Sequence, residues 1–183
     1  MVFVLFFLIF QKMMTHRFKK KLSPNFSRND KASLSHPTAN NNQGFWLTTT
    51  STRGYWSSMA KYCQNEAQGN LVKILSFEEN LAIYDVAVNQ YKSSYTFWTS
   101  GVNPLKEESE NVDNWYWLVG KDGNNGFENS TLIKMDGYTN WAGNNPQNNR
   151  DYMYVQLDRA QNNGIWYSYS EKVSKYGICE YRC

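Results

Sequence analysis

The sequence predicts an α+β domain in which one strand and two helices come first and several short strands follow. Apolar residues recur with the helical period in two stretches, within residues 56–69 and 76–91. Beyond them the helical period disappears, and short aromatic segments alternate with loops rich in Gly and Asn. Because helices and strands are segregated along the chain, a parallel sheet of βαβ units is not expected.

Length and charge indicate one folded domain with a basic tail. A chain of 183 residues suits a single domain and a terminal extension. Residues 1–31 hold seven Lys or Arg and one acid, whereas the remainder holds twelve Lys or Arg and fifteen acids. The remainder is therefore mildly acidic. A nucleic-acid-binding domain needs a basic face, so that class is not expected.

Residues 1–11 are expected to be a signal or other apolar segment. The apolar run at residues 2–10 is too short to span a bilayer, which needs about 20 residues, but it has the length of a signal-peptide core. It lacks a preceding charge and a clear cleavage site, so a truncated or mis-started N-terminus is an equal alternative. Residues 12–44 are predicted to be a disordered basic linker, with a solvated rather than membrane-bound lysine run, and residues 45–183 to be the domain.

The first elements of the domain follow from local patterns. Residues 45–52 are β-branched and aromatic, which predicts a strand. A helix is predicted next, because its apolar residues share one face: Trp56, Met59, Ala60, Cys63 and Ala67. Gly69 is expected to end that helix in the left-handed conformation.

A short strand at residues 71–75 and a second helix are predicted to follow. Ser76 is expected to cap this helix, and Glu79 three residues later completes a capping box. The apolar stripe of the second helix is predicted to consist of Phe77, Leu81, Tyr84, Val88 and Tyr91.

The second half of the chain is predicted to be strands and long loops. Five segments are expected as strands: FWTSG, WYWLVG, YMYVQL, GIWYSYS and YGICEYRC. Residues 102–114 and 120–151 are mostly polar, and loops of that length in a compact domain are usually functional or disordered. Every Trp and Tyr lies at or beyond Trp46, so the core is expected to be built from large rings.

The residue types argue against an enzyme. The only histidines, His16 and His36, lie in the expected tail, so no histidine-based triad is expected in the domain. No glycine-rich phosphate-binding motif occurs, and the spacing of the acids singles out no catalytic pair. No catalytic residue is therefore assigned.

Three cysteines, Cys63, Cys179 and Cys183, leave the redox compartment open at this stage. No Cys-x-x-Cys pair indicates a zinc or redox motif. One disulfide with a spare thiol fits an extracellular protein, and three free thiols fit a cytosolic one.

Several motifs in order carry a resemblance to a known family. They are WSSMAKYC, GNLVKILSFEEN, FWTSG, YTNWAGNNP, and GIWYSYS followed by YGICEYRC. Together they resemble the C-type lectin-like domain over residues 45–183. The resemblance implies a fold of two helices with small antiparallel sheets and a long loop region.

The resemblance also implies a disulfide between Cys63 and Cys179, which would close a loop of more than 100 residues. The second disulfide of the family has no counterpart, since Tyr152 or Met153 stands where its first cysteine is expected. Cys183 has no family partner, so it is either free or the bridge of a disulfide-linked dimer.

The motif Asn145-Pro146-Gln147 stands where sugar-binding members of the family share a calcium ion with a later Trp-Asn-Asp strand. Here both residues flanking the proline are amides, and Tyr167 and Ser168 follow Trp166 where the family offers Asn and Asp. Asp151 is the only anionic ligand left, and calcium wants six to eight oxygens with several carboxylates. Calcium binding by Asn145, Gln147 and Asp151 is therefore expected to be weak or absent, and no cofactor is required.

Three interpretations of this Asn-rich loop stay open: a solvated turn, a calcium-independent ligand contact, and a working calcium–sugar site. Beside the loop, Tyr residues alternate along two predicted strands and are expected to share one partly exposed face: Tyr152, Tyr154, Tyr167 and Tyr169. The predicted ligand-binding residues are Asn145, Gln147, Asp151 and Tyr167.

The function predicted from the sequence is extracellular recognition without catalysis. The first hypothesis is carbohydrate binding with weak or no calcium dependence. The alternatives are a lectin-like domain that binds a protein ligand, and a structural protein linked through Cys183. Asn25 and Asn129 lie in glycosylation sequons, which would be used only in a secreted chain.

Overall fold

The computed structural model describes residues 33–34, 43–48, 52–90, 95–120, 130–158 and 161–182, all of them within the compact unit Lys31–Cys183. Several predicted features lie outside the described residues, namely the apolar segment 1–11, Asn25, Tyr91, Asn129 and Cys183. None of the described helices is long and apolar enough to cross a membrane.

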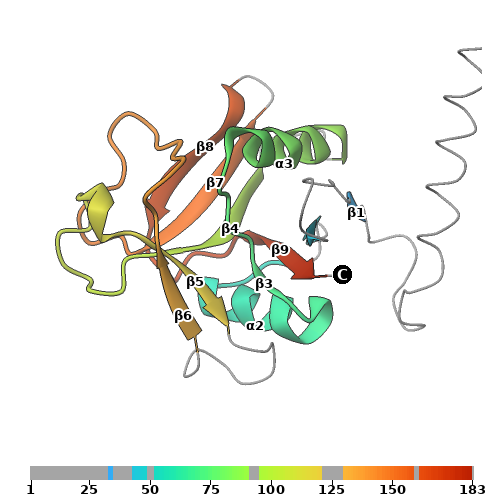
Figure 1. Ribbon diagram of the computed structural model, residues 1–183, viewed down its shortest axis with the longest axis horizontal. Coiled ribbons are helices and arrows are strands. Elements are labelled where there is room, and N and C mark those ends of the chain that lie inside the picture. The colour runs from blue at the N-terminus through green and yellow to red at the C-terminus, as the bar shows by residue number, and fades with distance from the viewer. Residues whose placement is uncertain are drawn as a thin grey trace, which may run out of the picture. The chain divides into compact units, whose positions relative to one another are not determined.

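The described chain forms two helices and a mixed β-sheet, which confirms the α+β class (Figure 1). The helices are α2 (Trp56–Ala67) and α3 (Phe77–Gln90), and a short 3-10 helix, η2, covers Val112–Asn114. The strands are β1 (Ser33–Leu34), β2 (Gln43–Leu47), β3 (Asn70–Leu71), β4 (Tyr95–Val102), β5 (Tyr116–Gly120), β6 (Ser130–Lys134), β7 (Tyr152–Asp158), β8 (Gln161–Tyr169) and β9 (Tyr176–Arg182).

Strand β9 joins the two ends of the domain. It pairs antiparallel with β2 on one side and parallel with β4 on the other. Beyond β4 the sheet continues antiparallel in two directions, through β7 to β8 and through β5 to β6. The predicted sheets were antiparallel, so the parallel β4–β9 pairing is a feature that the sequence did not reveal.

Helix α2 buries the predicted face. Trp56, Met59, Ala60 and Cys63 are all buried, because their spacing places them on one side of a 3.6-residue helix. The end of the helix differs from the prediction. Gln68, not Gly69, adopts the left-handed conformation, since the helix ends one residue earlier and the backbone N–H groups of both residues donate to the Cys63 carbonyl.

The disulfide implied by the family resemblance is present. Cys63 on α2 is bonded to Cys179 on β9, with their Cα atoms 5.3 Å apart and a sequence separation of 116. Both cysteines are fully buried. The bridge fastens the first helix to the last strand.

Helix α3 has the predicted Ser76 cap, but the Glu79 carboxylate binds the N–H of Leu75 and not that of Ser76, and the helix buries a different face. The N–H of Glu79 donates to the Ser76 hydroxyl (3.2 Å), and the Glu79 carboxylate accepts from the N–H of Leu75 (2.7 Å). The predicted stripe was wrong, because Phe77 is 47% exposed and the buried residues are Asn80, Ile83, Val86 and Ala87. The helix packs on β7 and β8, and Phe77 makes an edge-to-face contact with the Tyr138 ring.

The strand predictions were confirmed with three differences. The strand predicted at residues 71–75 is shorter, because β3 covers only Asn70–Leu71. One further hydrogen bond, from the N–H of Val72 to the Ile178 carbonyl, follows it. Strand β6 was missed, since its STLIK sequence lies inside a stretch assigned to a loop. Strand β1 and the start of β2 lie within the segment 12–44, so pairing begins before residue 45.

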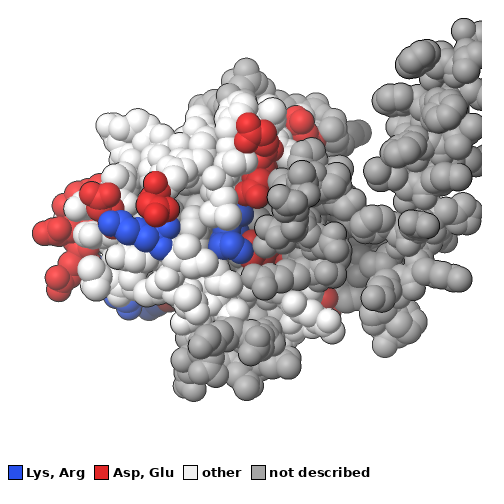
Figure 2. Space-filling view, in the orientation of Figure 1, with Lys and Arg blue, Asp and Glu red and all other residues white. Residues whose placement is uncertain are grey.

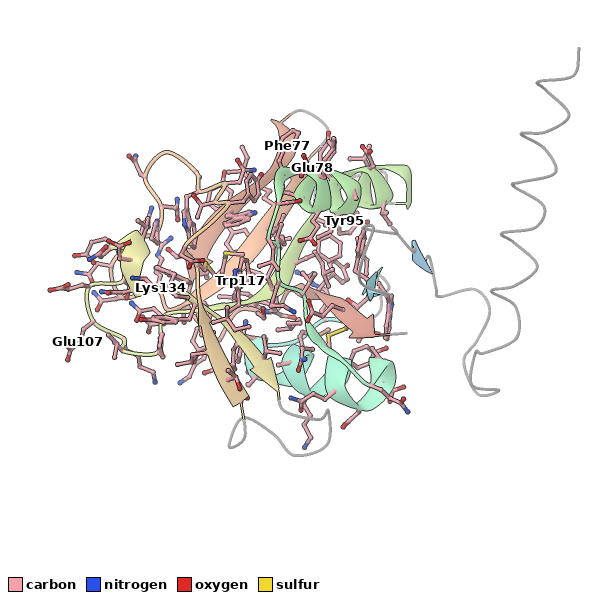
Figure 3. The ribbon with its side chains drawn as sticks, viewed as in Figure 1. Phe77, Glu78, Tyr95, Glu107, Trp117 and Lys134 are labelled. Carbon is pink, nitrogen blue, oxygen red and sulfur yellow. A yellow bond between two sulfur atoms is a disulfide. The ribbon has the colours of Figure 1, made fainter. Side chains whose placement is uncertain are left out.

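The core is built from large rings. Four of the seven Trp residues are at most 2% exposed, namely Trp98, Trp115, Trp117 and Trp166. Their contacts are mostly edge-to-face, as between Trp117 and Trp166 at 5.7 Å and 81°. Such geometry brings the positive edge of one ring to the negative face of the next. Figure 3 labels Trp117, which lies in the interior of the domain.

We expect loss of the disulfide to destabilise the domain strongly. The double variant Cys63→Ala, Cys179→Ala should lose about 4 kcal/mol of unfolding free energy, since the bridge closes a loop of more than 100 residues in the unfolded chain. Urea denaturation followed by tryptophan fluorescence measures the loss. Reductant should destabilise the native protein but not the double variant; equal midpoints for the two oxidised proteins would contradict the prediction.

Candidate functional site

The loop that carries Pro146 is joined to β8 through its backbone. Residues 142–150, here called the Pro146 loop, follow Trp141, which forms a β-bridge with Trp166. The N–H of Trp166 donates to the Asn140 carbonyl (2.9 Å), and the Trp166 carbonyl accepts from the N–H of Ala142 (2.9 Å). These bonds fix the entry of the loop against the sheet.

Ser168 holds the centre of the Pro146 loop. The Asn145 side-chain oxygen accepts hydrogen bonds from the Ser168 N–H (3.2 Å) and hydroxyl (3.4 Å). The Ser168 oxygen in turn accepts from the N–H of Gln147 (2.7 Å). Ser168 is fully buried, and the Asn145-Pro146 peptide bond is cis. We call these three hydrogen bonds the Ser168 clamp.

The clamp lies next to a buried contact with helix α3. The Trp166 indole N–H donates to the Asn80 side-chain oxygen (2.9 Å), and both residues are at most 1% exposed. Helix α3, strand β8 and the Pro146 loop are therefore coupled through Trp166. Sequence reasoning missed Asn80 and assigned no role to Ser168, although a polar residue amid a helix's apolar positions was a signal for the first.

Asp151 is not part of the clamp. Its carboxylate accepts from the Ser109 hydroxyl (2.7 Å), and its backbone carbonyl accepts from the N–H of Asn103 (2.9 Å). Asp151 thus fastens the loop between β4 and β5. Among the described residues it forms no hydrogen bond with Asn145 or Gln147.

The residues of the clamp around Pro146 include no carboxylate. The Asn145 oxygen already accepts hydrogen bonds, and Ser168 presents N–H and O–H donors where the family offers acids. No group of three His, Cys, Asp or Glu side chains able to hold a metal occurs within the part of the chain that the structure describes. Calcium requires several oxygens with free lone pairs and compensating charge.

The four predicted Tyr residues share one face of β7 and β8. Tyr152 pairs with Tyr169 and Tyr154 with Tyr167, and the last two rings stack at 5.2 Å and 12°. We call these four residues the tyrosine face. Because adjacent strand residues point to opposite sides, Tyr167 faces away from Ser168. The predicted set therefore divides, with Asn145 and Gln147 at the clamp and Tyr167 on the other side of the sheet.

A buried lysine lies among the aromatic rings of this face. The Lys175 ammonium is 3.8 Å from the centre of the Tyr154 ring and 4.8 Å from that of Tyr169. Only 6% of Lys175 is exposed, and burial, with the nearby Arg53 charge, lowers its pKa to about 8. Burial likewise raises the pKa of Tyr154 to about 12. Sequence reasoning missed Lys175, because nothing local marks a lysine as buried.

Acidic side chains gather elsewhere. On the face shown in Figure 2 they form a cluster at one margin, over the loop between β4 and β5, where Glu107 is labelled in Figure 3, and further acids lie near α3, where Glu78 is labelled. The members of the cluster are exposed: Glu107, Glu108, Glu110 and Asp113. They are solvated surface charges and do not reach the clamp.

A family model described as the lectin C-type domain matches residues 52–181. A perlucin-like protein from Mytilus galloprovincialis is 31% identical over 93 residues. That match covers 51% of this chain and 48% of the mussel protein, so the alignment spans about half of each.

Solved structures share the fold at low sequence identity. Human lithostathine superposes with a TM-score of 0.59 at 15% identity, over 90% of this chain and 98% of its own. The C-type lectin CEL-I from Cucumaria echinata gives 0.56 at 18%, over 85% and 97%. A calcium-independent type II antifreeze protein gives 0.52 at 19%, over 79% and 90%. These likenesses show the fold alone.

We expect Lys175→Met to stabilise the domain at neutral pH. The pKa of Lys175 is lower in the folded than in the unfolded protein, so the unfolded state binds more protons and the lysine opposes folding below about pH 8. That penalty fades as the pH rises from about 8 towards 10.5. The melting temperature of Lys175→Met should exceed that of the native protein most at pH 7, and the difference should shrink by pH 10. A constant or absent difference would refute the effect.

We expect Asn80→Leu to weaken the coupling of α3 to β8. Removing the acceptor leaves the buried Trp166 N–H without that partner, which should lower the unfolding free energy by about 1–3 kcal/mol. The exposed Asn65→Leu on α2 serves as the control and should change stability little. Equal chemical denaturation midpoints for the two variants would contradict the role given to Asn80.

Proposed function

The chain belongs to the C-type lectin domain family, and from that premise we propose that it is a recognition module that binds carbohydrate through the Pro146 loop without requiring calcium. The family model covers a binding domain, and no enzymatic family is indicated. We therefore propose no catalytic role.

The amide of Gln147 is the observation that carries this proposal. Its backbone is fixed by the Ser168 clamp, and its side chain is partly exposed. Within the described residues that amide has no hydrogen-bond partner. A primary amide offers two donors and an acceptor, which suits the hydroxyls of a sugar. A fixed loop loses little entropy on binding, so the contact is preorganised.

The clamp supports calcium independence. In place of an ion that gathers loop oxygens, Ser168 donates to Asn145 and accepts from Gln147. Asp151, the remaining candidate for an anionic calcium ligand, accepts a hydrogen bond from the Ser109 hydroxyl. We expect any calcium affinity to lie at or beyond the weak, millimolar end of the range for protein sites.

An extracellular location fits the buried disulfide. Such bridges persist in oxidising compartments and are rare in the cytosol. The signal segment at residues 1–11 and the sequons at Asn25 and Asn129 remain predictions, since all of them lie outside the described residues.

A protein ligand is the second candidate, and exposed apolar side chains favour it. They are 43–62% exposed and lie between β4 and the end of β6: Leu105, Val112, Leu132 and Ile133. Apolar anchors of this kind commonly carry protein–protein binding. The disulfide-linked dimer through Cys183 remains a third prediction.

We expect the protein to bind an array of neutral glycans equally in calcium and in EDTA. Gln147→Ala should weaken the strongest interaction about three- to tenfold, the loss of one neutral hydrogen bond. The exposed Asn65→Ala on α2 is the matched control and should bind as the native protein does. Calorimetric titration with calcium should show no saturable binding below about a millimolar.

If EDTA abolished glycan binding, the calcium-free mechanism would be refuted, but the proposal that the protein binds carbohydrate would stand. Glycan binding that Gln147→Ala leaves unchanged would remove the Pro146 loop from the site. Failure of the folded protein to bind any glycan would overturn the carbohydrate proposal in favour of a protein ligand.

A further inference from the structure

The tyrosine face carries positive charge that no described acid neutralises. Lys175 is buried beneath Tyr154 and Tyr169, and a buried ammonium is costly unless it is paired. No described carboxylate forms an ion pair with Lys175. The causes that lower the pKa of Lys175 are burial and Arg53, with no acid acting in the opposite direction.

Two arginines flank this lysine. The Arg150 guanidinium lies 5.0 Å from the centre of the Tyr169 ring, the ring that Lys175 also contacts. The Arg53 guanidinium donates to the Ser174 carbonyl (2.9 Å) and lies 5.0 Å from the centre of the Tyr176 ring. Neither arginine is ion-paired with a described carboxylate. Arg150 and Lys175 contact the rings of the tyrosine face, whereas Arg53 lies near Lys175 and contacts Tyr176, whose ring packs with Phe97 on the core side of the sheet.

Two acids lie near the edge of the surface without neutralising it. Burial raises the pKa of Tyr152, and the charges of Glu171 and Asp151 raise it further, so both acids lie near that ring. The Asp151 carboxylate accepts from Ser109, and neither acid bridges to Arg53, Arg150 or Lys175. The cations therefore lie along the diagonal from Tyr154 to Tyr169, whereas the two acids lie beside Tyr152, the cross-strand partner of Tyr169.

We propose that the tyrosine face, with Arg53, Arg150 and Lys175, is a second binding site, for carbohydrate that carries carboxylate or sulfate groups. The partly exposed rings of Tyr152, Tyr167 and Tyr169 suit the apolar face of a sugar, and their hydroxyls suit its polar rim. The two guanidinium groups offer paired donors that match carboxylate and sulfate oxygens.

The charge distribution favours an acidic sugar over a nucleic acid. Only three cations lie at or near the face, and the chain beyond residue 31 has more acids than bases. A nucleic-acid site needs a broad basic field to neutralise many phosphates. This site lies on the opposite side of β8 from the Ser168 clamp, and Arg150, the last residue of the Pro146 loop, is its only member from that loop.

The test compares ligands that differ in charge alone. We expect calorimetry to show binding of a trisaccharide of galacturonic acid and none of its uncharged methyl ester. Raising the salt from 50 to 300 mM should weaken the interaction, because exposed charges are screened. Equal binding of the methyl ester, or tighter binding of hexaglutamate or of inorganic sulfate than of the trisaccharide, would overturn the proposal.

Variants place the site on the molecule. Arg150→Gln and Lys175→Met should each weaken the trisaccharide about tenfold, whereas the exposed Lys134→Gln on β6 should not. Lys175→Met is expected to remain folded, and Arg150→Gln tests the site without altering the buried lysine. Native affinity in both variants would exclude this face.

A second readout does not depend on affinity. A bound anion should raise the pKa of Lys175, measured by NMR titration of its labelled ε-methylene group, because the negative charge offsets that of Arg53. An unchanged pKa in the saturated complex would refute contact with this face. Gln147→Ala should leave trisaccharide binding intact, so failure of the loop site and failure of this site are distinguishable.

Discussion

The indole of Trp166 is the contact on which the candidate site depends. The indole N–H donates to Asn80 of α3, and the Trp166 backbone pairs with Val155 of β7. The backbone N–H and carbonyl of Trp166 also bind the start of the Pro146 loop. Its ring meets Trp117, Tyr138 and Trp141 edge-on at 5.5–5.8 Å. One buried side chain thus joins helix, sheet and loop. The hydrogen bonds two residues later, at Ser168, extend these contacts into the centre of the Pro146 loop.

The Ser168 clamp holds the Pro146 loop through hydrogen bonds to a side-chain oxygen and a backbone N–H. An ion gathers oxygen atoms through charge, whereas Ser168 gathers one oxygen and one N–H through a hydroxyl and a backbone amide. The loop then needs no counter-charge. This agrees with the amides that flank Pro146 and leaves Asp151 to fasten a different loop.

The side chains on one side of β8 are uncharged, whereas those on the other side surround a charged lysine. The core side of the strand presents Ser168 and Trp166, and the outer side presents Tyr167 and Tyr169 against Lys175. Cation–π contacts make a buried lysine tolerable without a carboxylate, because the ring faces are electronegative. They do not cancel its charge, and the excess remains available to an anion.

The sequence by itself determined the order of the elements, the buried face of α2 and the cap of α3, because these depend on neighbours within one or two helical turns. Family resemblance added the Cys63–Cys179 bridge and the place of the Pro146 loop. The tertiary structure alone decided the buried face of α3 and the strand β6. It also decided the partners of Asn145, Asp151 and Lys175. These contacts join residues far apart in sequence, 23 for Asn145 and Ser168 and 86 for Asn80 and Trp166. Local periodicity carries no information on such pairs. The packing of whole helices and strands decides which polar atoms form hydrogen bonds and which charged side chains become buried.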